Sequence, residues 1–307
     1  MRRFFTFVIF LIALGAGLYT QRVEVLDWYR GVSAPVLPEA VGFEEVEKVE
    51  KVEEGDKVEE VGEVDEVEIL VPAVPSDVSE SEPSDLSESD VPLAQEQAVD
   101  EPATELTNES IQEESLPTSI NLAVPFTSQA PHGNWDEPYQ ESCEEASVYM
   151  VHAYFSGVDE GQIPPDTADA ELLKVIDFEN ELYGFYQDTT AEQAGMFAEL
   201  MYGHTYTVLT DPTIEDIQRA LVAGHPVIVP AAGRLLGNPY FTAPGPVYHM
   251  LVIRGYTQDG QFIVNDPGTF RGEAYLYDFD TIMSAMHDWN DGNEITEGKK
   301  AVLVLSP

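Results

Sequence analysis

Cysteine and basic residues are scarce in this chain. Cys143 is the only cysteine among 307 residues, so the chain cannot form an internal disulfide. Lysine and arginine together number 14, against 57 aspartate and glutamate residues. Proteins that bind nucleic acids need a basic surface to neutralise phosphates, so this composition argues against a nucleic-acid partner.

Sequence signatures of metal sites are also missing. The chain has no His-Glu-x-x-His motif, no pair of cysteines and no calcium-loop pattern. We therefore predict that the protein uses neither a metal ion nor an organic cofactor.

The longest apolar run lies at the N-terminus. Arg2 and Arg3 precede sixteen residues from Phe4 to Tyr19, and Arg22 follows. Positive residues ahead of a short apolar core predict an export signal over residues 1–22. A membrane span needs about 17–25 residues, so both a cleaved signal peptide and a retained signal-anchor remain open. We expect an exported protein, extracellular or at the cell surface, that contacts a membrane through this segment only.

An acidic segment follows, from residue 23 to residue 119. Between positions 41 and 120 there are 26 acidic residues and 3 lysines. Valine recurs every third residue from 45 to 68, which matches neither the helical nor the strand period. From Val71 onward serine, acidic residues and proline dominate. Such a segment buries too little apolar surface to offset its ordering entropy, so we predict a disordered linker.

Residues 120–307 have the composition of one folded domain. We expect a monomer, although nothing in the sequence decides the oligomeric state. Helical patterns come first and strand patterns later, which predicts an α+β fold rather than alternating βαβ units. The predicted helices cover residues 143–156, 166–183, 190–202 and 214–223. The third opens with Thr189-Thr190-Ala191-Glu192, which resembles a capping box with Thr189 as the cap. The predicted strands cover residues 122–126, 226–229, 250–253 and 262–264.

Cys143 stands at the start of a predicted helix that Gly157 ends. The helix dipole and the free N–H groups of the first turn favour a thiolate, the nucleophilic form of cysteine. In an exported protein an unpaired thiol risks oxidation, which favours a chemical role for it. The alternative is an inert cysteine that only fills space.

A nucleophilic cysteine needs a base and a residue that orients the base. His249 and Asp266 flank two apolar runs that are joined by a turn at Thr257–Gly260. Folding about this turn puts His249 opposite or diagonal to Asp266, with Cβ atoms roughly 5–8 Å apart. We therefore predict that His249 is the base and Asp266 orients it.

Four motifs together resemble the bacterial papain-like cysteine peptidases related to the double-glycine leader peptidases of bacteriocin exporters, the peptidase C39-like family. The similarity extends from residue 122 to about residue 280. The motifs are Val124–Gln129, Cys143–Ser147, His249 ahead of Val252–Tyr256, and Asn265–Pro267.

This resemblance implies a papain-like fold, in which an N-terminal helical part with the nucleophile helix packs on a C-terminal antiparallel sheet. It also implies that Cys143 attacks a peptide bond and that His249 is the general base and later the acid. Asp266 would orient the imidazole, and Gln129 would donate to the oxyanion. Gln140, which is nearer to the cysteine in sequence, is a rival for that last role.

The chain departs from the family pattern next to the cysteine. Many members carry Cys-Gly-Pro where this chain has Cys143-Glu144-Glu145, and carboxylates beside a thiol oppose its ionisation. Three other functions remain open: a cell-wall peptide amidase, a transpeptidase that uses the same acyl-enzyme, and a surface binding module without turnover.

Overall fold

The computed structural model describes residues 36–46 and 115–307. The helices of the domain are α3 (Cys143–Phe155), α4 (Pro165–Leu182), α5 (Ala191–Tyr202), α6 (Ile214–Val222) and α7 (Phe279–Ala285), with short 3-10 turns η1 (Tyr139–Glu141), η2 (Gly233–Leu236) and η3 (Ile295–Glu297). The strands are β1 (Ile120–Asn121), β2 (Thr205–Thr210), β3 (Val227–Ala232), β4 (Tyr248–Tyr256), β5 (Gln261–Asn265), β6 (Tyr275–Asp278) and β7 (Ala301–Ser306).

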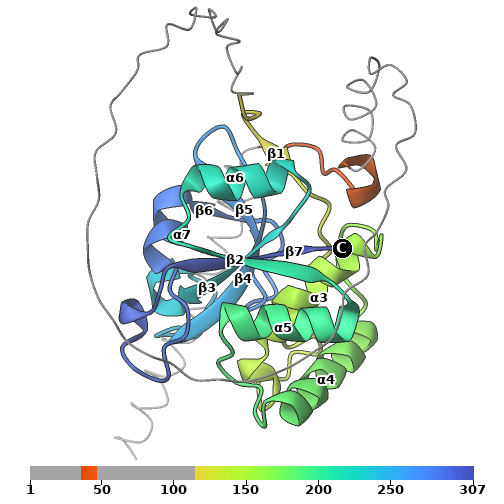
Figure 1. Cartoon of the computed structure of the whole chain (residues 1–307), viewed down its shortest axis with the longest axis vertical. Coiled ribbons are helices and arrows are strands. Elements are labelled where there is room, and N and C mark those ends of the chain that lie inside the picture. Colours follow the sequence, from red (N-terminus) through yellow and green to blue (C-terminus); the bar gives the residue numbers. More distant parts are fainter. Residues whose placement is uncertain (1–35, 47–114) are drawn as a thin grey trace, which may run out of the picture. The chain divides into compact units, whose positions relative to one another are not determined.

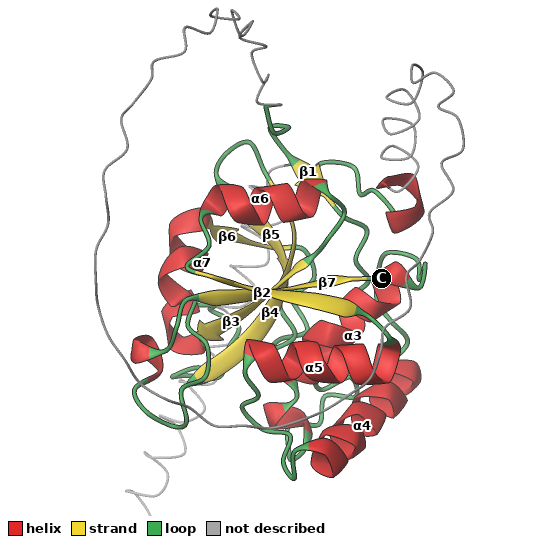
Figure 2. Cartoon of the chain, in the orientation of Figure 1, coloured by secondary structure: helices red, strands yellow, loops and turns green. Residues whose placement is uncertain are grey.

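The seven strands form one antiparallel sheet. Its order is β2-β7-β3-β4-β5-β6, and β1 pairs with the end of β4. The helices surround the strands, with α3, α4 and α5 grouped on one side (Figures 1 and 2). All four helices from α3 to α6 precede β3, so the predicted α+β class is confirmed.

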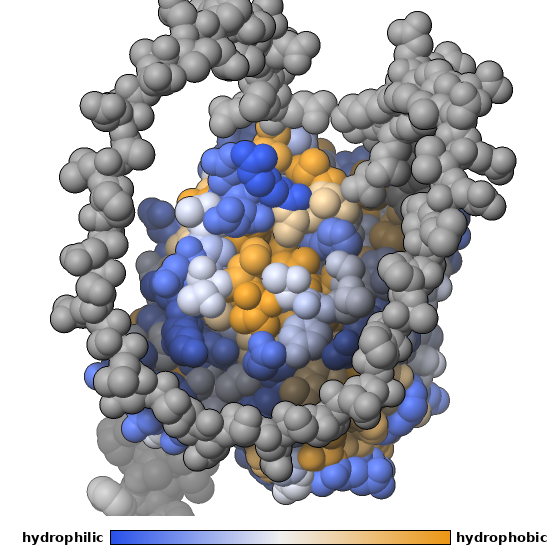
Figure 3. Space-filling model, in the orientation of Figure 1, coloured by the Kyte–Doolittle hydropathy of each residue, from blue (hydrophilic) through white to orange (hydrophobic). Residues whose placement is uncertain are grey.

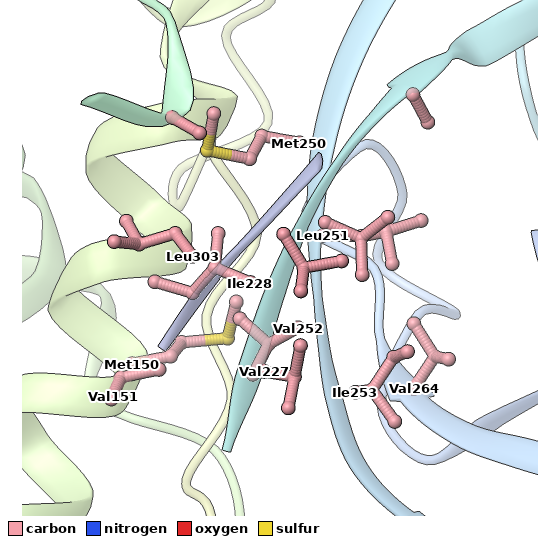
Figure 4. Packing of buried hydrophobic residues seen from close by; sticks show 14 of the residues in the cluster. Met150, Val151, Val227, Ile228, Met250, Leu251, Val252, Ile253, Val264 and Leu303 are labelled. Carbon is pink, nitrogen blue, oxygen red and sulfur yellow. The ribbon is translucent and has the colours of Figure 1, made fainter. Parts of the chain in front are cut away.

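The core lies between α3 and the middle of the sheet. All nine residues of β4 and all six of β3 are buried. Figure 4 shows Met150 of α3 extending toward apolar side chains of β3 and β4. Apolar burial is the main favourable term in folding, so this contact fixes α3 against the sheet.

The predicted helix after Cys143 is confirmed as α3, which has 13 residues. Gly157 beyond its end has φ +73, a backbone conformation that glycine adopts without steric cost. The predictions for α4 and α6 are each confirmed to within one residue at either end. The capping box of α5 is one residue later than its sequence pattern suggested, because Thr190 caps the helix and pairs with Gln193.

Strands β2, β6 and β7 and helix α7 are not among the predicted elements. Three of them are short and contain few consecutive apolar residues, whereas β7 is a run of five apolar residues at 301–305. The predicted strand over 122–126 is wrong, because β1 covers Ile120–Asn121 and the residues after it form only isolated bridges. Strand β2 forms one edge of the sheet and is only half-buried, with Val208 and Leu209 packed against the core. Apolar side chains reach the surface around β2, between α6 and α5 (Figure 3).

Residues 36–46 pack on the folded domain, although their sequence placed them in the acidic linker. Val41 forms a parallel bridge with Leu122, and its carbonyl accepts a 2.8 Å hydrogen bond from the Ala123 N–H. The Phe43 ring meets Tyr154 and Phe155 edge-on, with centroids 5.8 and 5.1 Å apart. A few apolar residues are enough to dock this part of the acidic segment on the domain. The average composition of the whole segment does not reveal them.

The predicted export signal, residues 1–22, and most of the predicted linker lie outside the described residues. Within the described ranges, no helix combines the length and apolar character that a membrane crossing requires.

We expect Phe43→Ala to lower the free energy of unfolding by about 1–2 kcal/mol, because it removes part of an apolar contact with α3. Val36→Ala is the matched control, since Val36 is 98% exposed in the same segment. Chemical denaturation of the full chain measures both values. Equal stability of the two variants would show that the packing of residues 36–46 contributes nothing.

Candidate active site

A cavity of about 640 Å³ contains both Cys143 and His249 in its lining. Cys143 comes from the start of α3 and His249 from the second residue of β4. Gln129, Glu144 and Gly268 line the same cavity. Three of the four predicted site residues therefore meet at one cavity, although they lie up to 120 positions apart in sequence.

The thiol of Cys143 lies against β4. The residue is only 6% exposed, and a hydrogen bond from the backbone of Met250 lowers the pKa of the thiol. Burial and the neighbouring Glu144 act in the opposite direction and are stronger, so the pKa of the thiol is raised well above its usual value. As the first residue of α3, Cys143 also has a backbone N–H without an intrahelical partner.

The β4–β5 hairpin brings His249 to Asp266. The ladder pairs Val252 with Asn265, and continuing that register puts His249 opposite Gly268 and diagonal to Asp266. His249 Nε2 lies 2.8 Å from Asp266 Oδ1, and both side chains are buried. Because the carboxylate holds Nε2, the other ring nitrogen, Nδ1, is the one left to exchange a proton with a thiol.

The Asp266 carboxylate accepts four hydrogen bonds. Oδ1 also accepts from the Gly268 N–H at 3.0 Å, and Oδ2 accepts from Asn238 Nδ2 at 3.0 Å and Tyr277 Oη at 2.7 Å. Burial alone would raise the pKa of Asp266, but the His249 charge and these hydrogen bonds outweigh it, so the pKa is lowered. Asp266 is therefore an anion, held in place beside the His249 ring by these hydrogen bonds.

Sequence reasoning missed Asn238 and Tyr277. Asn238 follows η2 in a long loop, and Tyr277 belongs to β6, so neither is near Asp266 in sequence. Tyr277 is paired with Phe262 across the β5–β6 ladder. Only that strand pairing, which has no local sequence signal, would have revealed its contact with the carboxylate.

Gly268 leaves room for the imidazole. A Cβ atom at this position would lie 2.9 Å from His249 Cε1 and 2.9 Å from Phe241 Cε1, closer than real contacts allow. The Phe241 ring meets the His249 ring edge-on at a centroid distance of 5.4 Å. The histidine is therefore held between an aromatic ring and a bare backbone.

Gln129 lines the cavity, with its amide turned toward η1. Its Nε2 donates to the carbonyls of Tyr139 and Gln140, both at 2.9 Å, and its backbone N–H donates to Pro267. Both amide hydrogens are thus used, and Oε1 has no partner among the described residues. Gln129 ties the turn before Cys143 to the loop after Asp266. Gln140, the rival, is exposed and also lines the cavity.

Glu144 and Glu145 are both buried, so the two carboxyl groups next to the cysteine do not face solvent. Glu144 Oε2 lies 3.0 Å from the Cys143 sulfur. Burial, followed by the charge of Glu145, raises the pKa of Glu144 well above its usual value. This residue is in direct contact with the candidate nucleophile.

Glu145 on α3 and Glu179 on α4 are both buried, and their carboxyl oxygens have no hydrogen-bond partner among the described residues. Burial and the neighbouring acidic groups oppose ionisation, so both carboxyls are held protonated. Burial, with a contribution from the charge of Glu144, raises the pKa of Glu179 to about 9.

Among the described residues, no group of three or more histidine, cysteine or acidic side chains is placed to hold a metal ion.

A buried thiol at a helix start, with an imidazole on the facing strand and a carboxylate bonded to that imidazole, defines the class of site found in cysteine peptidases. The family model described as Peptidase C39-like matches residues 121–292, more than half of the chain. The chain belongs to this family and is a cysteine peptidase. The nucleophile helix packed on an antiparallel sheet confirms the predicted papain-like arrangement.

Two solved structures show weaker similarity. A protein described as a C39-like peptidase from Bacillus anthracis is 15% identical, with a TM-score of 0.41, over 62% of this chain and 98% of its own. A fragment of prointerpain A from Prevotella intermedia is 14% identical, with a TM-score of 0.38, over 62% of this chain and 72% of its own. None of the curated proteins matches the chain.

We expect Glu179→Gln to make folding stability less dependent on pH. The carboxyl of Glu179 stays protonated in the folded state up to about pH 9 but ionises near pH 4.3 in the unfolded chain. Wild-type stability should therefore decrease as pH rises from about 5 to 9, by up to about 1.4 kcal/mol per pH unit for one proton.

Denaturation of the full chain at several pH values measures this slope. Glu181→Gln is the control, because Glu181 is exposed near the end of the same helix. An unchanged slope in Glu179→Gln, equal to that of Glu181→Gln, would contradict a protonated Glu179 in the folded state.

We expect Gly268→Ala to displace the His249 ring and to slow alkylation of Cys143 by iodoacetamide by about 100-fold, the cost of a misplacement near 1 Å. Gly42→Ala is the control, since a Cβ atom there meets nothing within 4 Å. A rate in Gly268→Ala equal to that of the control would show that the ring tolerates the added methyl group.

Proposed function

We propose that the protein hydrolyses peptide bonds with Cys143 as nucleophile, His249 as base and acid, and Asp266 as the residue that orients His249. The 2.8 Å contact between His249 Nε2 and Asp266 Oδ1, at a cavity that Cys143 also lines, is the observation that carries the proposal. The contact fixes which ring nitrogen handles the proton, as a nucleophile–base pair requires.

In the first half of the reaction His249 Nδ1 takes the thiol proton, and the sulfur attacks the peptide carbonyl. The tetrahedral intermediate collapses when the imidazolium gives that proton to the leaving amine. An acyl-enzyme thioester remains on Cys143. In the second half His249 removes a proton from water, the hydroxide attacks the thioester, and the proton returns to the sulfur as the acid product leaves. Asp266 stays ionised throughout.

The oxyanion needs donors near the sulfur. The backbone N–H of Cys143, free at the start of α3, supplies one of them. Gln129 supplies the second when substrate displaces one of the two carbonyls that its amide now holds. Removing such a donor typically costs about 3–4 kcal/mol of transition-state stabilisation. The exposed Gln140 is the alternative donor.

We further propose that the enzyme works outside the cytoplasm, on a peptide, a protein or a cell-wall peptide. The charged residues around the apolar run at 4–19 support export, and the aromatic lining of the cavity by Trp135, Phe241 and Trp289 supports binding of peptide side chains.

We expect Cys143→Ala to abolish cleavage of a peptide library by the full chain without unfolding it, because no other residue replaces the nucleophile. Mass spectrometry of the products measures cleavage, and circular dichroism verifies the fold. Ser156→Ala, at the other end of α3, is the matched control and should cleave normally.

Two outcomes separate the rival functions. Ligated rather than cleaved peptides in the presence of an added amine would identify a transpeptidase, and products from peptidoglycan alone would identify a cell-wall amidase. Full cleavage by Cys143→Ala would show that Cys143 is not the nucleophile and end the proposal. No cleavage by the wild type on either substrate would also end it and would favour a binding module.

A further inference from the structure

The Cys143 sulfur has one further contact, with Glu144, that has no role in the proposed hydrolysis. Glu144 Oε2 lies 3.0 Å from Cys143 Sγ, a distance at which the two groups share a hydrogen. Glu144 is 1% exposed and lines the same cavity as Cys143 and His249. It therefore touches the reacting atom directly.

The surroundings of Glu144 are acidic. The titratable groups near it are Glu141 in η1, Cys143 and Glu145 on α3, Glu179 on α4, Asp188 in the loop before α5, and Tyr248 and His249 on β4. No lysine or arginine of the described residues lines the cavity. A buried carboxylate without a cationic partner is costly, so this environment keeps the carboxyl group protonated.

The charges present when Cys143 is a thiolate also favour a protonated Glu144. When His249 takes the thiol proton, the imidazolium is neutralised by Asp266, and the thiolate adds one uncompensated negative charge. An ionised Glu144 would add a second one 3.0 Å away. Like charges at this distance in a buried site cannot both persist.

We propose that Glu144 is a catalytic residue that holds the Cys143 thiolate with a hydrogen bond from its protonated carboxyl group, and that ionisation of Glu144 switches the nucleophile off. The proposal rests on the proposed role of Cys143 as nucleophile. The carboxyl keeps its own proton, and the thiol proton goes to His249. The Met250 backbone donates the second hydrogen bond to the sulfur.

Part of the upward pKa shift of the thiol depends on the charge of Glu144. Burial is the largest cause that raises the pKa of the Cys143 thiol, and the charge of Glu144 and its hydrogen bond come next. The contribution of the charge disappears when Glu144 is protonated. The neutral carboxyl then stabilises the thiolate as a donor, as charge-assisted hydrogen bonds do.

The sign of the pH dependence follows. Because the pKa of Glu144 is raised, its neutral form persists above the usual range of a carboxyl group, and thiolate reactivity is present there. Reactivity decreases as pH rises through the pKa of Glu144. An ordinary cysteine behaves in the opposite way, since its alkylation rate increases with pH up to about 8.5.

The test measures the rate of Cys143 alkylation by iodoacetamide in the full chain, between about pH 5 and pH 9. Alkylation needs no peptide substrate, so its outcome is independent of whether the peptide library is cleaved. We expect the wild-type rate to fall toward alkaline pH. In Glu144→Gln, which keeps a donor but cannot ionise, we expect the rate to persist to higher pH.

Glu144→Met fills a similar volume without a donor. We expect it to react about 10- to 100-fold more slowly than the wild type at acidic pH, the factor that one hydrogen bond to a charged group supplies. Glu141→Gln is the matched control, because it removes a carboxyl from the same cavity that has no hydrogen bond to the sulfur. It should shift the profile far less than Glu144→Gln.

Three results would overturn the proposal. A Glu144→Gln profile that coincides with the wild type would show that the carboxyl does not titrate against the thiol. Loss of alkylation in Glu144→Gln at every pH would make Glu144 the proton acceptor instead. A Glu144→Met rate equal to the wild-type rate at acidic pH would show that the Glu144 hydrogen bond does not stabilise the thiolate. This variant also tests the proposal if Glu144→Gln does not fold.

Discussion

The packing of α3 against β4 is the contact on which the site depends. The helix supplies the sulfur and the strand supplies the imidazole, and more than a hundred positions separate them in sequence. Met150 on the helix lies in the same buried cluster as Met250, Leu251 and Val252 on the strand. Because protein interiors are close-packed, a shift of the helix along the strand would open voids, and this resists separation of Cys143 from its partner strand.

A second level of order fixes the direction of the imidazole. The β4–β5 register sets the distance to Asp266, and two side chains from other elements complete the coordination of its carboxylate. Phe241 limits the ring on one side, and Gly268 permits its approach on the other. The histidine thus depends on a hairpin, a loop and an outer strand together, which explains why so much of the domain is needed to orient one ring.

The sequence predicted the parts of this site that have local signals. A helix start marks Cys143, and a turn between two apolar runs brings His249 near Asp266. Of the two expected positions, opposite and diagonal, the structure has the diagonal one. Asn238 and Tyr277 gave no such signal, because their role depends on which strands become neighbours. The burial of Glu144 was equally invisible, since acidic residues in a first helical turn usually face water.

The docking of residues 36–46 has a consequence for proteolysis. These residues and the domain are joined through residues 47–114, yet they also touch directly through Val41 and Phe43. A single cut within 47–114 would therefore turn one folded chain into a two-piece complex. The pieces would then separate according to their dissociation constant, so release of the enzyme from its N-terminal part would depend on dilution as well as on cleavage.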